Sequence, residues 1–373
     1  MKTGLLHYWL TNQRGGEKVL SALGEMLPDA DILTHAYRPS AFGEDSRDRL
    51  WGHRVKESLI ARLPFGRRHP QAYLPLMPAA TRALDLDGYG LLVSSESGPI
   101  KGIRKPAGAR HVCYCHTPMR YLWDLHRAYY RSAGLGGKLA MTLFTRYLRR
   151  EDLKSAETVD VFVANSAFVA ERIRRLYGRG STVVHPPVDV GFFSGAADVP
   201  QACPFEPKSY YLYAGELRDY KRPDLAVEAC LRMNRRLVVV GNGRMREALA
   251  RRAGGRGSVV FLGRVSDQAL HGLYGNARAL LFPGVEDFGI VPVESQAAGT
   301  PVIACGQGGA LETVTEGETG LFFPEGSLEA LCAALETFEA RAWDPAVCRR
   351  RAQRFSKDAF VRNMRTVLAD PPR

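Results

Sequence analysis

The chain has 373 residues, 45% of them hydrophobic, and this length favours two domains over a single core. No run approaches the ~20 apolar residues of a membrane-spanning helix, and the start is too short and too polar for a signal peptide. The net charge of +12 is uneven, because residues 51–150 hold 17 Lys and Arg against 5 Asp and Glu, and the rest holds 34 of each. Such a basic region predicts an anionic partner, either lipid headgroups or nucleic acid. The alternative is a basic surface that is only solvated.

The seven cysteines are odd in number and scattered, without the spacing of metal ligands. Free buried thiols in a cytosolic protein explain this pattern best. Two Asp-x-Asp matches, at 29–31 and 85–87, lack the surroundings of a metal site. We therefore predict neither an essential metal nor a cofactor.

Short apolar runs alternate with helical patterns through the first half of the chain. Strands are expected at residues 4–10, 31–36, 91–95, 111–115 and 159–164, and helices at 17–26 and 166–177. Such alternation is typical of parallel βαβ units in an α/β domain. We expect this domain to cover residues 1–190.

Two strand ends in this half carry candidate site residues. Gly15 and Gly16 follow the first strand and open a helix, where the absence of Cβ lets the backbone approach a phosphate or a sugar. A plain strand–helix turn is an equally common reason for two glycines. His116 directly follows the strand at 111–115, and ligands of open α/β sheets bind at the carboxyl ends of strands. A lone histidine is otherwise usually structural.

Residues 138–158 predict an amphipathic basic helix that carries Arg146, Arg149 and Arg150. Three explanations are open: a core-packed helix with a solvated basic face, a helix that docks on an anionic membrane surface, and a nucleic-acid contact. No recognised nucleic-acid module accompanies the charge. We therefore expect peripheral membrane contact through the basic N-terminal domain, and no nucleic acid.

The alternation restarts after residues 191–207, which are rich in Gly, Ala and Pro and which we interpret as a linker. Strands are expected at 210–214, 237–240, 259–262, 279–282, 302–305 and 320–323, and helices at 225–233 and 267–274. The tail from 327 to 368 is expected to be helical. These patterns predict a second α/β domain at 208–354 and a final helix within 355–373.

Polar residues and glycines again follow the strands of the second half. Lys221 comes after the first of these strands, either as a phosphate-binding cation or as a solvated lysine beside a helix. Gly241 lies in a Val-Gly-Asn-Gly turn after the next strand. Arg246 occupies the position of the third glycine of a dinucleotide fingerprint, which disfavours a nicotinamide dehydrogenase. Arg264 and Val265 follow the third strand.

The most informative segment contains two carboxylates, Glu286 and Glu294, that are separated by seven residues. A helix is expected to begin near Pro292, since proline fits the first turn, and a helix start attracts anions such as phosphate. Gly289 would let a ligand approach the backbone closely. The backbone N–H groups expected at this helix start belong to Phe288, Gly289, Ile290 and Val291. A phosphate cradle between two acceptors for hydroxyl groups suits a nucleoside-diphosphate sugar.

This Glu-x7-Glu segment, with Phe-Gly between the glutamates and with Ala-Gly-Thr-Pro-Val-Ile and Gly308-Gly309 after them, resembles the signature of the retaining glycosyltransferases of family four. The resemblance covers nearly all of the chain. It implies the GT-B fold, in which two Rossmann-like doubly wound α/β domains face a central cleft. In that fold the last helix commonly crosses back to the first domain, which we expect of the helix within 355–373.

The resemblance also implies roles for the candidate residues. Glu286 would hold hydroxyl groups of the donor sugar, Glu294 would hold the ribose, and Lys221 would stabilise the departing diphosphate. His116 would orient the sugar from the other domain. The remaining residues expected to line the donor are Gly15, Gly16, Gly241, Arg264, Val265, Phe288, Gly289, Ile290 and Val291.

One position departs from the family pattern. Glu216 stands where the family usually has the first of two phosphate-binding cations. Arg218 is our candidate for a replacement, although spacing alone does not show that it folds back to the phosphates.

The substrate class is also implied by resemblance. Met-Arg-Tyr-Leu-Trp-Asp, directly after His116-Thr-Pro, resembles a bacterial subgroup that makes O-antigens and exopolysaccharides, several of whose members are mannosyltransferases. We therefore expect a metal-independent transfer of mannose from GDP-mannose, with retention, to a lipid-linked (polyprenyl diphosphate) saccharide. The expected location is cytoplasmic, at the inner face of the cell membrane.

Three alternatives stay open. The same fold and mechanism would serve a UDP-sugar donor. A sugar-nucleotide epimerase can share the fold, but it would need no acceptor and would not explain the basic half. A non-catalytic module that binds an anionic ligand would tolerate the loss of Glu286.

Overall fold

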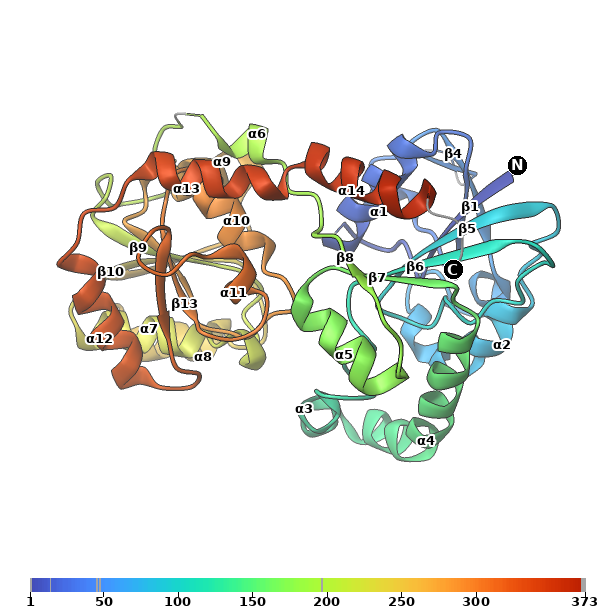
Figure 1. Cartoon of the computed structure of the whole chain (residues 1–373). Helices are drawn as coiled ribbons and strands as arrows, with labels where there is room; N and C mark the ends of the chain where they lie inside the picture. The colour runs from blue at the N-terminus through green and yellow to red at the C-terminus, as the bar shows by residue number, and fades with distance from the viewer. Residues whose placement is uncertain (1, 14, 45, 47, 196, 370–373) are drawn as a thin grey trace. The chain divides into compact units, whose positions relative to one another are not determined.

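The computed structural model describes residues 2–13, 15–44, 46, 48–195 and 197–369. The chain divides into two compact units (Figure 1). Unit 1 comprises Met1–His185 and Val361–Arg373, and unit 2 comprises Pro186–Phe360. The residues at 370–373, the end of the predicted final helix, lie outside the described part.

Unit 1 contains a sheet with the strand order β3-β4-β2-β1-β5-β6-β7-β8. Its strands are β1 (Lys2–His7), β2 (Asp31–Thr34), β3 (Arg49–Leu50), β4 (His53–Glu57), β5 (Tyr89–Glu96), β6 (Arg110–Cys115), β7 (Val161–Ala164) and β8 (Thr182–Val183). All neighbouring strands are parallel except β3 and β4, which pair antiparallel. The order reverses between β1 and β5, and such a switch point is where open α/β sheets bind ligands.

Helices lie on both faces of this sheet (Figure 1). They are α1 (Gly15–Met26), α2 (Met77–Arg82), α3 (His126–Ser132), α4 (Leu135–Glu157), α5 (Ala167–Tyr177) and the end of α14 (Lys357–Ala369), with short 3-10 turns η1 (Pro39–Ala41), η2 (Leu59–Arg62) and η3 (Pro70–Leu76). Arg110 of β6 donates to the carbonyl oxygens of Val367 and Leu368 at 2.9 and 2.7 Å. A guanidinium that satisfies the last carbonyls of a helix fixes the end of α14 to unit 1.

Unit 2 contains a parallel sheet with the order β11-β10-β9-β12-β13-β14, in which the switch point lies between β9 and β12. The strands are β9 (Tyr210–Ala214), β10 (Arg236–Val240), β11 (Val259–Gly263), β12 (Ala279–Phe282), β13 (Val302–Cys305) and β14 (Gly320–Phe323). The helical segments are α6 (Val190–Phe193), η4 (Asp219–Lys221), α7 (Pro223–Arg232), α8 (Arg246–Ala253), α9 (Asp267–Asn276), α10 (Ile290–Ala297), α11 (Ala310–Thr313), α12 (Leu328–Glu339), α13 (Pro345–Ala352) and η5 (Gln353–Phe355).

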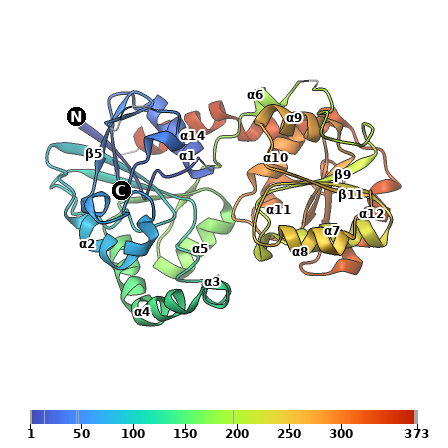
Figure 2. The same ribbon diagram turned by 180° about the vertical axis from the view of Figure 1, so that it is seen from behind.

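Successive residues of these strands pack on opposite faces of the sheet. Leu212 of β9 belongs to one hydrophobic cluster and its neighbours Tyr211 and Tyr213 to another. Helices α7 and α8 cover one face, and α9 and α10 the other (Figure 2). A sheet that is buried on both faces needs strands that are continuously apolar, as the sequence of β9 is.

The predicted fold class, α/β with two Rossmann-like doubly wound domains, is confirmed by these two sheets. The antiparallel pair β3–β4 was not predicted. β3 has only two residues, and β4 alternates buried and more exposed side chains, so neither forms an apolar run. The seven cysteines are free thiols, of which Cys332 is partly buried and the others are buried.

Candidate functional site

The switch point of unit 2 holds an ion pair between Lys221 and Glu286. Lys221 ends the turn η4 after β9, and Glu286 lies in the loop after β12. The distance from Lys221 Nζ to Glu286 Oε1 is 2.7 Å, and the two side chains are 19% and 22% exposed. Burial lowers the pKa of Lys221, but the charge of Glu286, the hydrogen bond to Glu286, and the neighbouring Tyr220 and Glu216 together raise that pKa above its ordinary value. The ammonium group is therefore charged.

Glycines let the loops around this pair pack backbone against backbone. A Cβ built on Gly241, whose φ is +122°, would lie 1.9 Å from the carbonyl oxygen of Gly215. A Cβ on Gly284 would lie 2.6 Å from Cα of Lys221. Side chains at these positions would displace neighbouring backbone, so the glycines determine the shape of the site. In the sequence, only Gly241 of these three was a candidate.

The loop after β12 leads into α10 as the sequence predicted. The helix begins at Ile290, two residues before Pro292, and its N-cap is Gly289 with φ +89°. Phe288 is buried, and its ring packs against Phe355 at 5.5 Å between centroids. Ile290 and Val291 are partly buried against the same core cluster.

Glu294 lies within α10 and is 5% exposed. Its Oε2 accepts a hydrogen bond of 3.1 Å from the hydroxyl group of Tyr274. Burial, together with this carboxylate, raises the pKa of Tyr274 well above its ordinary range, so the phenol stays protonated and donates. The carboxylate of Glu294 is thus held in one orientation. Its predicted contact with a ribose stays a prediction.

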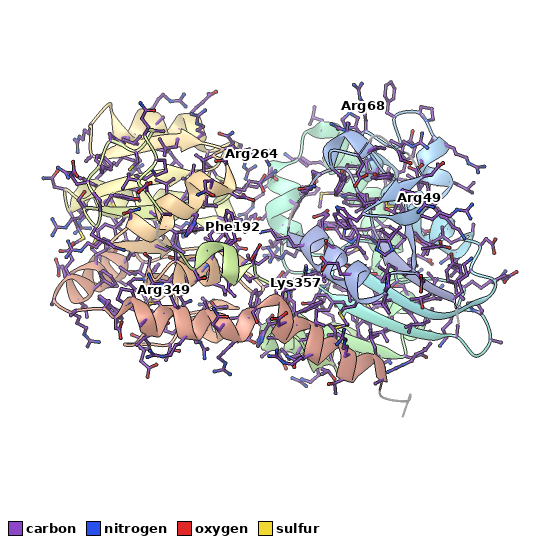
Figure 3. The ribbon with its side chains drawn as sticks, turned by 90° about the horizontal axis from the view of Figure 1, so that it is seen from above. Arg49, Arg68, Phe192, Arg264, Arg349 and Lys357 are labelled. Carbon is purple, nitrogen blue, oxygen red and sulfur yellow. The ribbon has the colours of Figure 1, made fainter. Side chains whose placement is uncertain are left out.

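The position that departs from the family pattern has a local partner. Arg218 Nε donates to Glu216 Oε1 at 2.8 Å, and both side chains are partly exposed. The guanidinium that we expected to replace the missing cation therefore folds onto Glu216. Farther along the edge of the sheet, Arg264 is exposed on the loop after β11 (Figure 3). Val265 is partly buried and packs against the core.

The switch point of unit 1 holds a chain of polar side chains around His116. His116 Nε2 lies 2.8 Å from Ser95 Oγ, and Ser95 Oγ lies 3.3 Å from Nδ1 of His7. Nε2 of His7 lies 3.5 Å from Oε1 of Glu17, in the first turn of α1. His7 and Ser95 are fully buried, and Glu17 is 3% exposed. This series of polar side chains thus connects β1, α1, β5 and the residue after β6.

His116 is uncharged near neutral pH. Burial first, and then the neighbouring His7, lower the pKa of His116 to about 3, while Glu17 opposes the shift. A neutral imidazole donates through one nitrogen and accepts through the other. His116 can therefore orient a hydroxyl group by hydrogen bonding, and it does not supply a positive charge.

Gly16 lies beside this chain of side chains. A Cβ on Gly16 would lie 3.3 Å from the hydroxyl oxygen of Tyr8, 3.5 Å from Cε1 of His7 and 3.6 Å from Nε2 of His116. The structure thus brings two predicted site residues of unit 1, Gly16 and His116, close together, and Gly15 precedes them as the first residue of α1.

The sequence analysis missed His7, Glu17 and Ser95. His7 and Ser95 lay inside predicted strands, where buried side chains are usually structural. Ser95 ended its predicted strand, but His7 lay in the middle of the strand expected at 4–10, which the structure ends at His7. The sequence also does not show that these two strands are neighbours at a switch point.

A buried charge cluster lies next to Ser95. Lys101 Nζ contacts Glu96 Oε1 and Asp152 Oδ1, each at 2.5 Å, and all three side chains are buried. Burial raises the pKa of Glu96 to about 7, although Lys101 opposes the shift. The backbone N–H of His116 donates to the carbonyl oxygen of Glu96 at 2.8 Å. The cluster therefore supports the loop that carries His116.

The helix α4 presents apolar side chains outward. Leu135, Leu139 and Leu143 recur every four residues and are 88%, 61% and 62% exposed. The buried side chains of α4 are Thr145, Leu148, Asp152 and Ala156, so none lies in the first ten residues of the helix. Of the three explanations left open for this helix, the core-packed one does not fit the first turns of α4, because their leucines are exposed.

Two classes of feature are absent from the described residues. No group of three or more His, Cys, Asp or Glu is placed to hold a metal ion in the described ranges. Within the same ranges, no helix has both the length and the apolar content required to cross a bilayer.

Models of protein families match both halves of the chain. Residues 14–192 match Glycosyltransferase Family 4, and residues 199–360 match Glycosyl transferases group 1. A glycogen synthase of Mycobacterium tuberculosis is 30% identical over 226 residues, 56% of this chain and 53% of the relative. A D-inositol 3-phosphate glycosyltransferase of Kribbella flavida is 32% identical over 213 residues, 51% of this chain and 50% of the relative. The chain thus spans about half the length of the curated relatives it matches.

Solved structures share the fold over the whole chain. The sucrose-phosphate synthase of Thermosynechococcus elongatus superposes with a TM-score of 0.73 at 22% identity, covering 99% of this chain and 98% of the other. HepE of Anabaena, in complex with UDP and glucose, superposes with a TM-score of 0.73 at 16% identity and covers both chains fully. At these identities the likeness establishes the fold alone.

Proposed function

The chain belongs to the glycosyltransferases, with a Family 4 domain in its first half and a group 1 domain in its second, and from this premise we propose that it transfers a hexose from a nucleoside-diphosphate sugar to a saccharide acceptor. The anomeric configuration of the sugar is retained in this proposal. No metal takes part in it, because Lys221 and backbone N–H groups carry the electrostatic role.

The ion pair of Lys221 with Glu286 at the switch point of unit 2 is the observation that carries the proposal. Negative charge develops on the departing diphosphate in the transition state, so a charged ammonium aimed at that position lowers the barrier. Lys221 is charged and partly buried, which strengthens its interaction with a phosphate. The backbone N–H groups of Gly289 and Ile290 would add donors at the start of α10.

Glu286 is proposed to bind hydroxyl groups of the donor sugar beside the reacting carbon. When a diphosphate neutralises Lys221, the carboxylate becomes available to the sugar. Retention in glycoside hydrolases uses a carboxylate nucleophile. We assign no such nucleophile here and propose instead that the leaving phosphate helps to deprotonate the acceptor on the same face of the sugar.

The other predicted residues complete the donor site in this proposal. Glu294 would accept from the ribose with an oxygen that Tyr274 does not use, and neutral His116 would orient the sugar. The residues proposed to line the remainder of the donor are Gly15, Gly16, Arg218, Gly241, Arg264, Val265, Phe288 and Val291.

Two donors are candidates. The sequence around His116 supports GDP-mannose, through its likeness to bacterial mannosyltransferases. UDP in the HepE complex supports a UDP-sugar. We propose GDP-mannose as the first donor to test and a UDP-hexose as the second.

A lipid-linked saccharide is the proposed acceptor, reached from the inner face of the cell membrane. The exposed leucines of α4 and the exposed Arg146 and Arg150 on the same helix support this part of the proposal. Apolar side chains can enter the headgroup region while arginines contact anionic lipids.

Thermal denaturation with GDP, UDP, ADP or dTDP, each alone and without metal, tests the donor site. A ligand at a hundredfold excess over its dissociation constant stabilises the folded state by about 2.7 kcal/mol, so the donor base should be evident. A shift with GDP supports mannosyl transfer, and a shift with UDP replaces the sugar but keeps the mechanism. If no nucleotide shifts the folded protein, a binding module for another anionic ligand replaces the proposal.

Product analysis then tests the reaction. The nucleotide sugar that corresponds to the stabilising nucleotide is incubated with a polyprenyl diphosphate saccharide, and the new linkage is examined by NMR. A retained anomeric configuration supports the proposed mechanism. Conversion of the nucleotide sugar without any acceptor would identify an epimerase instead.

A further inference from the structure

The side chains around His116 form a relay of polar contacts with a carboxylate at one end. Ser95 makes hydrogen bonds to both histidines, whereas Nε2 of His7 has no hydrogen-bond partner among the residues that the structure describes and faces Glu17 at the distance of a charge contact. The order is Glu17, His7, Ser95 and His116, with distances of 3.5, 3.3 and 2.8 Å between successive polar atoms. Glu17, His7 and Ser95 come from α1, β1 and β5, so a relay of this kind requires the fold and not a local turn.

With one ring proton on each imidazole, a relay of two imidazoles and one hydroxyl group has two possible directions of hydrogen-bond donation. In the first, His7 carries its proton on Nε2, Ser95 donates to His7 Nδ1, and His116 Nε2–H donates to Ser95. In the second, His7 carries its proton on Nδ1 and donates to Ser95, and Ser95 donates to the unprotonated Nε2 of His116. The two directions leave His116 in opposite tautomers.

The carboxylate of Glu17 distinguishes the two directions. It lies 3.5 Å from Nε2 of His7, and an anion at that distance favours a proton on this nitrogen. With the proton on Nε2, His7 Nδ1 is an acceptor, and the first direction follows. His116 then carries its proton on Nε2 and has an unprotonated Nδ1.

We propose that Glu17, acting through His7 and Ser95, fixes His116 in the Nε2–H tautomer, so that Nδ1 is an acceptor for a hydroxyl group of the bound sugar. Glu17, His7 and Ser95 are positioning residues in this scheme, and only His116 contacts the substrate. No hydrogen bond within the described residues uses His116 Nδ1, which is consistent with an acceptor reserved for a ligand. The assignment of a sugar hydroxyl group as the partner of Nδ1 rests on the proposed function, whereas the tautomer of His116 does not.

The tautomer is measured directly by long-range 1H–15N NMR of the full chain labelled with 15N-histidine, with the His116 signals assigned from H116Q. The wild-type protein is expected to show the Nε2–H pattern for His116. E17Q is expected to populate both tautomers, because the side-chain amide that replaces the carboxylate presents either an acceptor or a donor to His7. An Nδ1–H pattern in the wild type, or an unchanged pattern in E17Q, would overturn the proposal.

Two further variants separate the relay from a general effect on folding. S95A removes the bridging hydroxyl group with little change in volume, and we expect it to lose the tautomer preference of His116 even if E17Q folds poorly. S94A is the matched control, because Ser94 Oγ lies 2.9 Å from Nε2 of the buried His111 on the same two strands. S94A should leave the His116 signals in place, and a shift in S94A equal to that in S95A would contradict the relay.

Activity provides a second readout. If the proposed transfer is correct, E17Q and S95A should reduce kcat about tenfold, the value of one well-directed hydrogen bond, with the affinity for the free nucleotide unchanged. If E17Q and S95A change the tautomer of His116 but the wild type has no transferase activity, the relay is supported and the proposed function is rejected. Activity in the wild type with no tautomer change in S95A would do the reverse.

Discussion

Replacing Glu286 by glutamine should tighten the binding of a free nucleoside diphosphate while turnover falls. The carboxylate of Glu286 lies 2.7 Å from Nζ of Lys221, so a phosphate that binds this ammonium group must compete with it. A free nucleotide has no sugar hydroxyl groups to compensate for the carboxylate. The substitution E286Q would keep the shape of the side chain and remove the competing charge.

The magnitude follows from the geometry of the pair. A phosphate oxygen that binds the same ammonium group at ~2.8 Å would lie within about 5 Å of the carboxylate. Two unit charges at that separation repel by about 1 kcal/mol in water and about 3 kcal/mol at an effective dielectric constant of 20. Because both side chains are only about one fifth exposed, we expect the larger value, which corresponds to roughly a hundredfold tighter binding.

Titration calorimetry with GDP and with UDP measures this change, and the matched control is E339Q. Glu339 lies 2.7 Å from Arg235 and is 16% exposed, a pair like that of Glu286 but bonded also to Tyr211 near the start of β9. E339Q should leave the affinity unchanged. Turnover in E286Q should fall about a hundredfold, the usual loss when a transition-state contact is removed. Weaker or unchanged nucleotide binding in E286Q would refute the competition between Glu286 and phosphate.

Three other predictions concern the glycines, the charge cluster and α4. G241A should destabilise unit 2 by at least about 3 kcal/mol in denaturant unfolding, because its Cβ would overlap the main chain of Gly215. G254A, at a helix end where the Cβ would make only an ordinary contact with the carbonyl oxygen of Arg252, should cost about 1–2 kcal/mol for its positive φ. The folded state keeps a proton on Glu96 up to about pH 7, whereas the unfolded chain loses it near pH 4.5. The free energy of unfolding should therefore fall by up to about 3 kcal/mol as pH rises from 4.5 to 7, and E96Q should lack this fall. If the free energy of unfolding of the wild type and of E96Q changed with pH in parallel, the raised pKa of Glu96 would be contradicted. The double substitution of Leu139 and Leu143 by Glu should reduce sedimentation with phosphatidylglycerol vesicles about tenfold or more, and L311E, at another exposed leucine, should not.

The strands of unit 2 could be predicted closely from the sequence. Strands at 210–214, 279–282, 302–305 and 320–323 have the predicted bounds, because parallel strands buried on both faces are continuous apolar runs between turns. The exposed leucines of α4 could not be predicted, since the same helical spacing also suits a helix packed on a core. Whether the leucines of α4 are exposed or packed on a core depends on the segments around the helix, and these are distant in the sequence.

The candidate sites divide in the same way. Lys221 and Glu286 were found because each lies in a recognisable segment after a strand, and their contact follows from the adjacency of β9 and β12. His7, Ser95 and Glu17 carry no local signal. Their proximity to His116 depends on the strand order of unit 1, which a single sequence does not contain.

The close packing of glycine backbones around Lys221 has a consequence for protein engineering. Because a Cβ on Gly241 or Gly284 would overlap neighbouring main chain, we expect most substitutions at these two positions to disturb folding, and we expect a loop graft to require exchange of the contacting segment as well. Under the proposed function, donor preference is better altered through exposed side chains proposed to line the donor, such as Arg264. A library for a new donor sugar should therefore vary such exposed side chains and leave the glycine framework intact.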